Sequence, residues 1–311
     1  MHISAKKIIL DCVDLALKVS SPNQTLPRHL PTDNKNAVTV ISVGKAAASM
    51  AVEFEKYWQG SIKGLAVVPY HYREPLKYFE QIEASHPIPD QMSVRAAGRV
   101  FELTNSLNSS DTVFVLLSGG SSSLICYPAG SINFLEKQKI NCALIRSGAN
   151  INEINCVRKQ LSAIKGGRLA AHCRPAKVYT FAISDVVGDD PSIIGSGPTI
   201  ADPTTPNDAK KILDKYDITT PASISHWLKR VHPEKDNLDN KSKNYTIISS
   251  GTMMLDKVAQ FSKKSNLDII NLGELEGDAC DIAWKTATYL ANIKPKIPTL
   301  LISGGEATVK L

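Results

Sequence analysis

The sequence has no long uninterrupted run of apolar residues, and this absence excludes an obvious membrane-spanning helix. A span needs about 20 such residues. The apolar segment near the start, in MHISAKKIILDCVDLALKV, is broken by Asp11 and Asp14. That segment is therefore predicted to be an amphipathic helix and not a signal peptide. We expect no membrane partner.

Paired cysteines and blocks of like charge are also missing. The six cysteines are scattered and form no C-x-x-C pair, which argues against a zinc or redox motif and favours reduced thiols in a cytoplasmic protein. The net charge of +6 is spread over 311 residues without a basic tail. We therefore expect no nucleic-acid partner, whereas an acidic small-molecule substrate suits the mild positive excess.

Three familiar nucleotide-site motifs are absent. Gly44 and Lys45 lack the upstream glycine of the P-loop G-x-x-x-x-G-K-[ST], and the run 195–197 continues into a proline and gives no G-x-G-x-x-G. An H-R-D kinase loop is missing as well. These absences count against an ordinary P-loop ATPase and against a Rossmann dehydrogenase.

What the sequence does contain is an alternation of expected strands and helices. Apolar strands are expected at 37–44, 63–70, 112–117, 177–186, 245–250, 268–273 and 298–305. Helices are expected at the start of the chain and at 45–58, 91–107, 206–216, 252–265 and 277–293, with a largely helical region ending near 171. This alternation is typical of an α/β fold with a mostly parallel, Rossmann-like sheet and helices on both faces.

The stretch 231–244 is the most polar part of the chain and predicts a boundary. We expect an N-terminal α/β domain at 1–235, a linker at 236–244 and the start of a second α/β domain at 245–311. A segment as short as the last one buries only a marginal core. The second domain is therefore expected to be incomplete.

Four expected strand ends carry small and polar residues, at 44–47, 118–123, 184–190 and 303–308. Open α/β sheets bind ligands beyond the carboxyl ends of their strands, and small residues let an anion approach the backbone. A run of glycines and serines is equally compatible with a simple turn. The residues expected to bind phosphate or substrate here are Ser118, Gly119, Gly120, Ser121 and Ser122.

Four cations gather in a short segment: Arg158, Lys159, Lys165 and Arg168. On a continuous helix Arg158 and Lys165, seven positions apart, would share one face, and a solvated basic face is one interpretation. The glycine pair at 166–167 weakens such a helix by about 1 kcal/mol per glycine relative to alanine. A tight anion site is the second interpretation.

Carboxylates follow the strand expected at 177–186. Asp185 lies at its carboxyl end, and Asp189 and Asp190 lie in the next turn. Such carboxylates suit Mg²⁺ coordination or proton abstraction from a hydroxyl group, while capping of the next element is the simpler alternative. The loop continues through Ser196 and Gly197, which are again small and polar.

One histidine, His86, lies in a proline-flanked loop at 85–90. It either orients a ligand or makes a structural hydrogen bond. No serine and aspartate neighbourhood marks it as part of a triad, so hydrolase chemistry has little support.

Five motifs in one order resemble those of the glycerate 2-kinase family with a MOFRL C-terminal domain, some of whose members are labelled hydroxypyruvate reductase. The motifs are SVGKAAASMA (42–51), SHPIPD (85–90), LSGGSSSLI (117–125), NEINCVRKQLSAIKGGRLA (152–170) and SDVVGDDPSIIGSGPT (184–199). The resemblance covers essentially the whole chain. It implies ATP-dependent phosphorylation of D-glycerate at its 2-hydroxyl, with Mg²⁺, in a cleft between two α/β domains.

The resemblance also implies roles for individual residues. Lys45 and one or two of the four cations should face phosphate oxygens, and an arginine should hold the glycerate carboxylate. The expected catalytic residues are Lys45, Asp189 and Asp185. Metal ligands are expected among Asp189, Asp190 and Glu306, and Ser196 and Gly197 are expected to help bind phosphate or substrate.

The sequence departs from the family in two places. Ser123 stands where the family usually has alanine, and the family's C-terminal domain continues beyond the motif matched by Gly304, Gly305, Glu306, Thr308 and Val309. A shortened C-terminal domain is therefore expected to impair catalysis. Two alternatives stay open, a hydroxypyruvate reductase and a truncated remnant that binds ligands without turnover. A homodimer is also left open.

Overall fold

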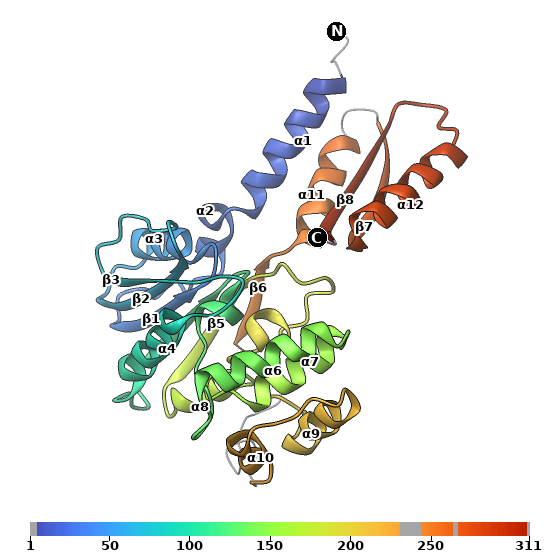
Figure 1. The fold of residues 1–311 in the computed structure, drawn as a ribbon. Coiled ribbons are helices and arrows are strands. Elements are labelled where there is room, and N and C mark those ends of the chain that lie inside the picture. The colour runs from blue at the N-terminus through green and yellow to red at the C-terminus, as the bar shows by residue number, and fades with distance from the viewer. Residues whose placement is uncertain (1–4, 231–243, 264–266, 310–311) are drawn as a thin grey trace.

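The computed structural model describes residues 5–230, 244–263 and 267–309. Its larger sheet has six parallel strands and is covered by helices (Figure 1). The strands follow the order β3-β2-β1-β4-β5-β6. Their bounds are β1 (Val38–Val43), β2 (Ile62–Pro69), β3 (Phe79–Ala84), β4 (Thr112–Leu117), β5 (Lys177–Ile183) and β6 (Tyr245–Ser249). The strand order reverses between β1 and β4, and in open α/β sheets ligands bind beyond the carboxyl ends of the strands at such a point. The predicted α/β, Rossmann-like fold is confirmed.

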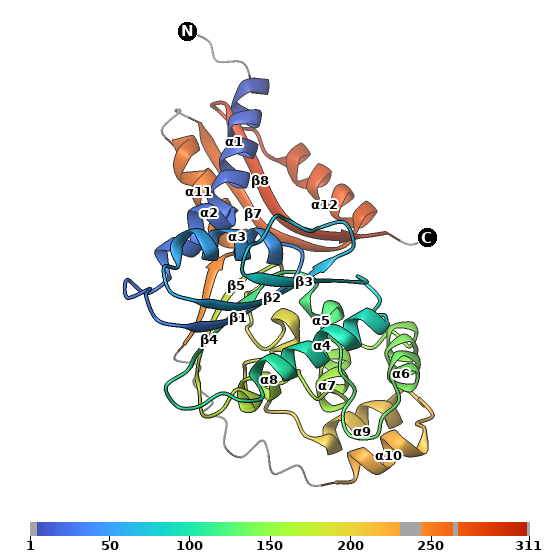
Figure 2. The same cartoon turned by 90° about the vertical axis from the view of Figure 1, so that its left-hand side faces the viewer.

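Helices cover both faces of this sheet, and further helices form a layer beside it (Figure 2). The α-helices are α1 (Ala5–Ser20), α2 (Pro22–Thr25), α3 (Ala47–Tyr57), α4 (Gln91–Thr104), α5 (Ser121–Leu124), α6 (Phe134–Arg146), α7 (Ile151–Gln160), α8 (Arg168–His172), α9 (Pro206–Lys215), α10 (Ala222–Leu228), α11 (Gly251–Lys263) and α12 (Ala279–Asn292). Two 3₁₀ turns are η1 (Leu26–Arg28) and η2 (Ile194–Ser196). Within the described ranges, no helix combines the length and apolar character of a membrane span.

The core follows from the sequence of the strands. All six residues of β1 are buried, as expected for a central parallel strand covered on both faces. On one face Phe54 of α3 packs with Phe114 of β4. On the other face Val100 of α4 packs in a cluster with Val115. A separate apolar cluster joins α6 and α7, which lie between β4 and β5, with α9 and α10, which lie between β5 and β6. The helical layer beside the sheet therefore has its own core.

Strand β6 corrects one sequence-based expectation. Residues 245–250 were expected to open the second α/β unit, but β6 pairs in parallel with β5 and completes the first sheet. Ile248 and Ser249 are buried there. Most of the predicted linker, 236–243, lies outside the described residues. The domain boundaries themselves stay a prediction.

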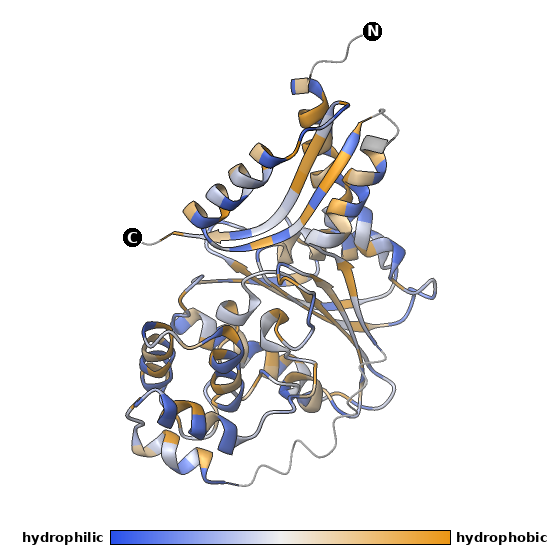
Figure 3. Ribbon diagram, turned by 90° about the vertical axis from the view of Figure 1, so that its right-hand side faces the viewer, coloured by the Kyte–Doolittle hydropathy of each residue, from blue (hydrophilic) through white to orange (hydrophobic). Residues whose placement is uncertain are grey.

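A second, two-stranded parallel sheet consists of β7 (Asp268–Asp278) and β8 (Thr299–Thr308). The expectation that 303–308 forms a loop after a strand is wrong, because β8 continues to pair with β7 as far as Thr308. Gly305 makes this possible, since a Cβ there would lie 2.1 Å from the Leu275 carbonyl oxygen. Figure 3 shows apolar residues along both strands and on α12, where Trp284 is 72% exposed.

Candidate active site

Two loops meet at the point where the strand order reverses. The backbone N–H of Lys45, after β1, donates to the carbonyl oxygen of Gly119, after β4, at 2.8 Å. The Ala46 N–H donates to Ser118 Oγ at 3.0 Å. Gly44 has φ +135°, and a Cβ there would lie 2.1 Å from Ser118 Oγ, so only glycine fits. The structure thus fixes exposed Lys45 at the carboxyl edge of the sheet.

The glycine pair after β4 is also where the loops after β3 and β5 arrive. A Cβ at Gly119 would lie 2.1 Å from Asp185 Oδ2, and one at Gly120 would lie 2.7 Å from His86 Cδ2. Both side chains therefore pack on glycine backbone. The N–H groups of Gly119 and Gly120 donate no hydrogen bond to any residue that the structure describes. The geometry thus offers two backbone donors beside a carboxylate and an imidazole.

The serines of this loop have different surroundings. Ser118 is buried, and its hydroxyl oxygen accepts the Ala46 N–H bond, so it ties two loops together. Ser121 is buried against Gly195, and its Oγ has no hydrogen-bond partner in the described part of the chain. Ser122 Oγ lies 2.9 Å from Ser196 Oγ. The loop is therefore a junction between the ends of β4 and the 194–197 turn.

The electrostatic surroundings of His86 identify which charges share this region. Burial lowers the pKa of His86, and the positive charge of Lys45 lowers it further, while Asp185 and Glu306 act in the opposite direction. Glu306 belongs to β8, so the second sheet contributes a carboxylate to the surroundings of His86. Four charged or titratable side chains from four loops and strands thus surround the edge of the first sheet.

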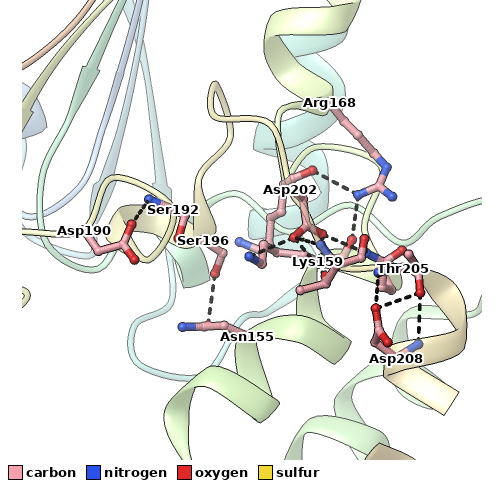
Figure 4. Close-up of polar contacts among 12 residues, drawn as sticks. Asn155, Lys159, Arg168, Asp190, Ser192, Ser196, Asp202, Thr205 and Asp208 are labelled. Carbon is pink, nitrogen blue, oxygen red and sulfur yellow. Dashed lines mark hydrogen bonds and ion pairs between the residues drawn. The ribbon is translucent and has the colours of Figure 1, made fainter. Parts of the chain in front are cut away.

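The two carboxylates after Asp185 differ in their contacts. Asp190 Oδ1 accepts the Ser192 N–H at 2.8 Å and so caps the local turn (Figure 4). Asp189 has φ +55°, and its buried Oδ1 accepts no hydrogen bond from the described residues. A cation would satisfy that orphaned oxygen. No group of three or more metal-ligating side chains is found in the described ranges, but Mg²⁺ on a phosphate needs only one or two carboxylates.

Two of the four predicted cations are held inside the protein. Lys159 Nζ lies 3.0 Å from Asp202 Oδ1, with side-chain exposures of 8% and 0%. Arg168 donates to the carbonyl oxygens of Lys159 and Lys165 at 2.7 and 3.1 Å. Figure 4 shows how these side chains converge. We call Lys159, Gln160, Arg168, Asp202 and Thr204 the Asp202 cluster; Gln160 and Thr204 also donate to the aspartate.

The segment that carries these cations is not one continuous helix. Helix α7 ends at Gln160 and α8 starts at Arg168, so the expectation of a shared helical face for Arg158 and Lys165 is wrong. The break has a physical cause. Gly166 N–H donates to the Ser196 carbonyl at 3.1 Å, and Gly167 N–H donates to the Gly197 carbonyl at 2.7 Å. The glycine pair thus fastens the cationic segment to the 195–197 turn.

The other two cations, Arg158 and Lys165, line a cavity of about 520 Å³ together with Lys137. We call it the basic cavity; its further walls include Pro87, Ser122, Cys126, Leu135 and Ile145. Burial lowers the pKa of Lys165 to about 7 and that of Lys137 to about 8. Desolvation by burial also lowers the pKa of Arg158. The interpretation of a solvated basic face therefore fails for this segment.

Lys137 was not singled out from the sequence, although a signal was present. The buried residues of α6 are Lys137, Ile140 and Leu144, spaced i, i+3 and i+7. That spacing is the apolar stripe of an amphipathic helix. A lysine that occupies such a stripe is buried by the packing of its helix, and here its Nζ donates to the Leu161 carbonyl at 2.8 Å.

Comparisons with known proteins agree on one group of relatives. A family model described as a domain of unknown function (DUF4147) matches residues 8–229. The chain is 37% identical to the D-glycerate 2-kinase of Thermotoga maritima over 98% of this chain and 74% of that protein. It is 36% identical to a glycerate 2-kinase of Pyrococcus horikoshii, over 95% of this chain and 69% of that protein.

The chain is also similar to a second named protein and to a solved structure. A protein of Agrobacterium vitis, provisionally named hydroxypyruvate reductase, is 37% identical over 99% of this chain and 72% of its own length. The crystal structure of a glycerate kinase from Thermotoga maritima matches with a TM-score of 0.84 and 34% identity, covering 98% of this chain and 74% of that one.

Proposed function

This chain belongs to the glycerate 2-kinase family, and on that premise we propose that it transfers a phosphoryl group from ATP to the 2-hydroxyl of D-glycerate, giving 2-phosphoglycerate. The observation that carries the proposal is the meeting of Lys45, Gly119–Gly120 and Asp185 at the point where the strand order reverses. Phosphoryl transfer needs mainly positioning and neutralisation of charge. A cation, two backbone donors and a carboxylate provide both.

Lys45 and the backbone N–H groups of Gly119 and Gly120 are proposed to bind the transferring phosphoryl group. Donors fixed by the fold stabilise developing charge without reorganisation. The Lys45 loop is fixed by its hydrogen bonds to Gly119 and Ser118. Removal of the lysine charge should therefore affect the transition state more than the ground state.

The carboxylates are proposed to divide two tasks. Asp185, packed on Gly119, is proposed to accept the proton of the 2-hydroxyl. Asp189 offers its orphaned Oδ1 to Mg²⁺, which when bound would neutralise phosphate charge. Asp190 is engaged by Ser192 and is the less suited of the two neighbours, while Glu306 remains a second proposed ligand from β8.

The hydroxypyruvate reductase alternative has less support. The sequence lacks a dinucleotide fingerprint, and the name of the Agrobacterium relative is provisional. A cytoplasmic location, a MOFRL-type second domain and a homodimer stay predictions.

The test of the proposed function is an assay of the purified chain with ATP, Mg²⁺ and D-glycerate, in which ³¹P NMR separates 2-phosphoglycerate from its isomer. We expect 2-phosphoglycerate and no oxidation of NAD(P)H with hydroxypyruvate. Lys45→Ala should lower kcat by about 100-fold or more, while Lys56→Ala, at an exposed surface pair, should not. Oxidation of NAD(P)H without phosphorylation would overturn the proposal.

A further inference from the structure

We propose that the basic cavity is the nucleotide site, with the polyphosphate at Lys137, Arg158 and Lys165 and the purine base against the apolar rim. The inference rests on the proposed function, because it takes ATP as the phosphoryl donor. It adds a location for the donor and assigns Lys137 to it. The cavity lies beside the meeting point of the strand-end loops and not within it.

The charge balance of the cavity is the first argument. None of the described residues that line it is an aspartate or a glutamate. Among the described residues, Lys137 Nζ donates only to carbonyl oxygens. Lys165 Nζ donates to the Ser122 carbonyl at 2.6 Å, to the Ser122 hydroxyl at 3.1 Å and to the Ile125 carbonyl at 3.4 Å. The Arg158 side chain has no hydrogen bond or ion pair with any described residue. Buried cations without a counter-charge are costly, and a polyanion offsets that cost.

Part of the lining of the cavity is apolar and exposed to solvent. Ile88, Leu135 and Ile145 line the cavity and are 63%, 58% and 57% exposed. Large aliphatic side chains grouped at the mouth of a cavity commonly mark a binding surface. A flat, partly apolar base suits this rim, whereas a small polar acid would gain nothing from it.

Size separates the two substrates. The cavity holds about 520 Å³, within the range of about 300–1,000 Å³ that is typical of sites for drug-sized ligands. A three-carbon hydroxy acid would leave most of that space empty and could not span from the rim to the cations. A nucleoside triphosphate has both the length and the charge.

The position of the cavity also fits a phosphoryl donor. Ser122 lines the cavity, bonds Lys165 and contacts Ser196 across the junction. His86 lies at the strand-end site, and the next residue, Pro87, lines the cavity. A polyphosphate held by Lys165 therefore ends at the loop that contains Gly119 and Gly120, where transfer is proposed to occur.

Equilibrium binding to the whole chain, measured by calorimetry, tests the assignment. The probes are ATP, inorganic tripolyphosphate and D-glycerate, each titrated alone. Ile145→Asp places a negative charge at the exposed rim, and Ile151→Asp is the matched control, because Ile151 is 54% exposed and does not line the cavity. We expect Ile145→Asp to weaken ATP binding at least tenfold and the control to leave it unchanged.

Lys137→Met is the second variant, and it should weaken ATP and tripolyphosphate by similar factors of ten or more. The inference is overturned if ATP binds both variants as tightly as it binds the wild type, or if the variants weaken D-glycerate binding instead. Failure of the proposed function would look different. ATP would still bind in the cavity with these dependences, but no 2-phosphoglycerate would form.

Discussion

The Asp202 cluster and the basic cavity each take two cations from the segment 158–168, yet the two regions differ in how they surround buried positive charge. In the Asp202 cluster, Lys159 faces a carboxylate whose side chain is fully buried. Arg158 and Lys165 join Lys137 in a cavity where the described part of the chain supplies no carboxylate to the lining. Charge that the protein satisfies internally holds the fold, whereas charge left without a counter-ion is available to a ligand. On this contrast we propose that Lys159 is a structural cation and that Arg158 and Lys165 are binding ones.

The largest effect, on the free energy of unfolding, is expected when the Lys159–Asp202 ion pair is broken. Lys159→Met removes the partner of Asp202, whose side chain is fully buried. Removing one member of a buried ion pair typically costs about 3–5 kcal/mol, so the free energy of unfolding in urea should fall by about that amount. Lys210→Met, at an exposed pair, is the control and should change stability by less than about 1 kcal/mol.

A loss at position 159 no larger than the loss at position 210 would contradict the structural role of the Asp202 cluster. Nucleotide affinity gives a second readout. At urea concentrations below its unfolding transition, the Lys159→Met protein should bind ATP as tightly as the wild type, because Lys159 does not line the basic cavity.

The second prediction concerns pH. The pKa of Lys165 is lowered to about 7 and that of Lys137 to about 8, in both cases chiefly by burial. As pH rises through these values the free protein loses positive charge from the cavity, so ATP affinity should fall. We expect a decrease of about tenfold or more between about pH 6 and pH 9, followed by calorimetry. An affinity that stays level or rises over this range would exclude these lysines from the nucleotide site.

The smallest expected effect is the stability of Lys137→Met. Lys159→Met and Lys137→Met are both changes from lysine to methionine. At position 137, however, the change removes a buried cation that has no carboxylate partner among the described residues. Apolar replacement of buried charge is often neutral or stabilising, so the free energy of unfolding should stay within about 1 kcal/mol of the wild-type value or rise. A loss comparable to that of Lys159→Met would erase the distinction between the two regions.

The sequence predicted the sheet, and it predicted which residues lie at the edge that we propose as the site, because these features are local. Apolar runs that end in glycine or serine placed Lys45, Gly119 and Asp185 at strand ends, and parallel strands bring such ends to one edge. The short strand β3 was missed because its sequence, FEQIEA, mixes charged and apolar residues at a sheet border.

Contacts that depend on distant residues could not be predicted. Lys159 forms an ion pair with Asp202, which lies in a later loop. No sequence pattern near either residue predicts this pair. β6 belongs to the first sheet because it pairs with β5. The sequence of β6 alone does not show which sheet it joins. Lys137 was visible only in the register of its own helix, where it shares a stripe with Ile140 and Leu144.

A crystal structure of the chain with a non-hydrolysable ATP analogue tests the central claim most directly. The account predicts phosphate oxygens within hydrogen-bond distance of Lys165 and Arg158, the base against Leu135 or Ile145, and an unchanged Lys159–Asp202 pair. A nucleotide bound elsewhere, with the basic cavity empty, would contradict it.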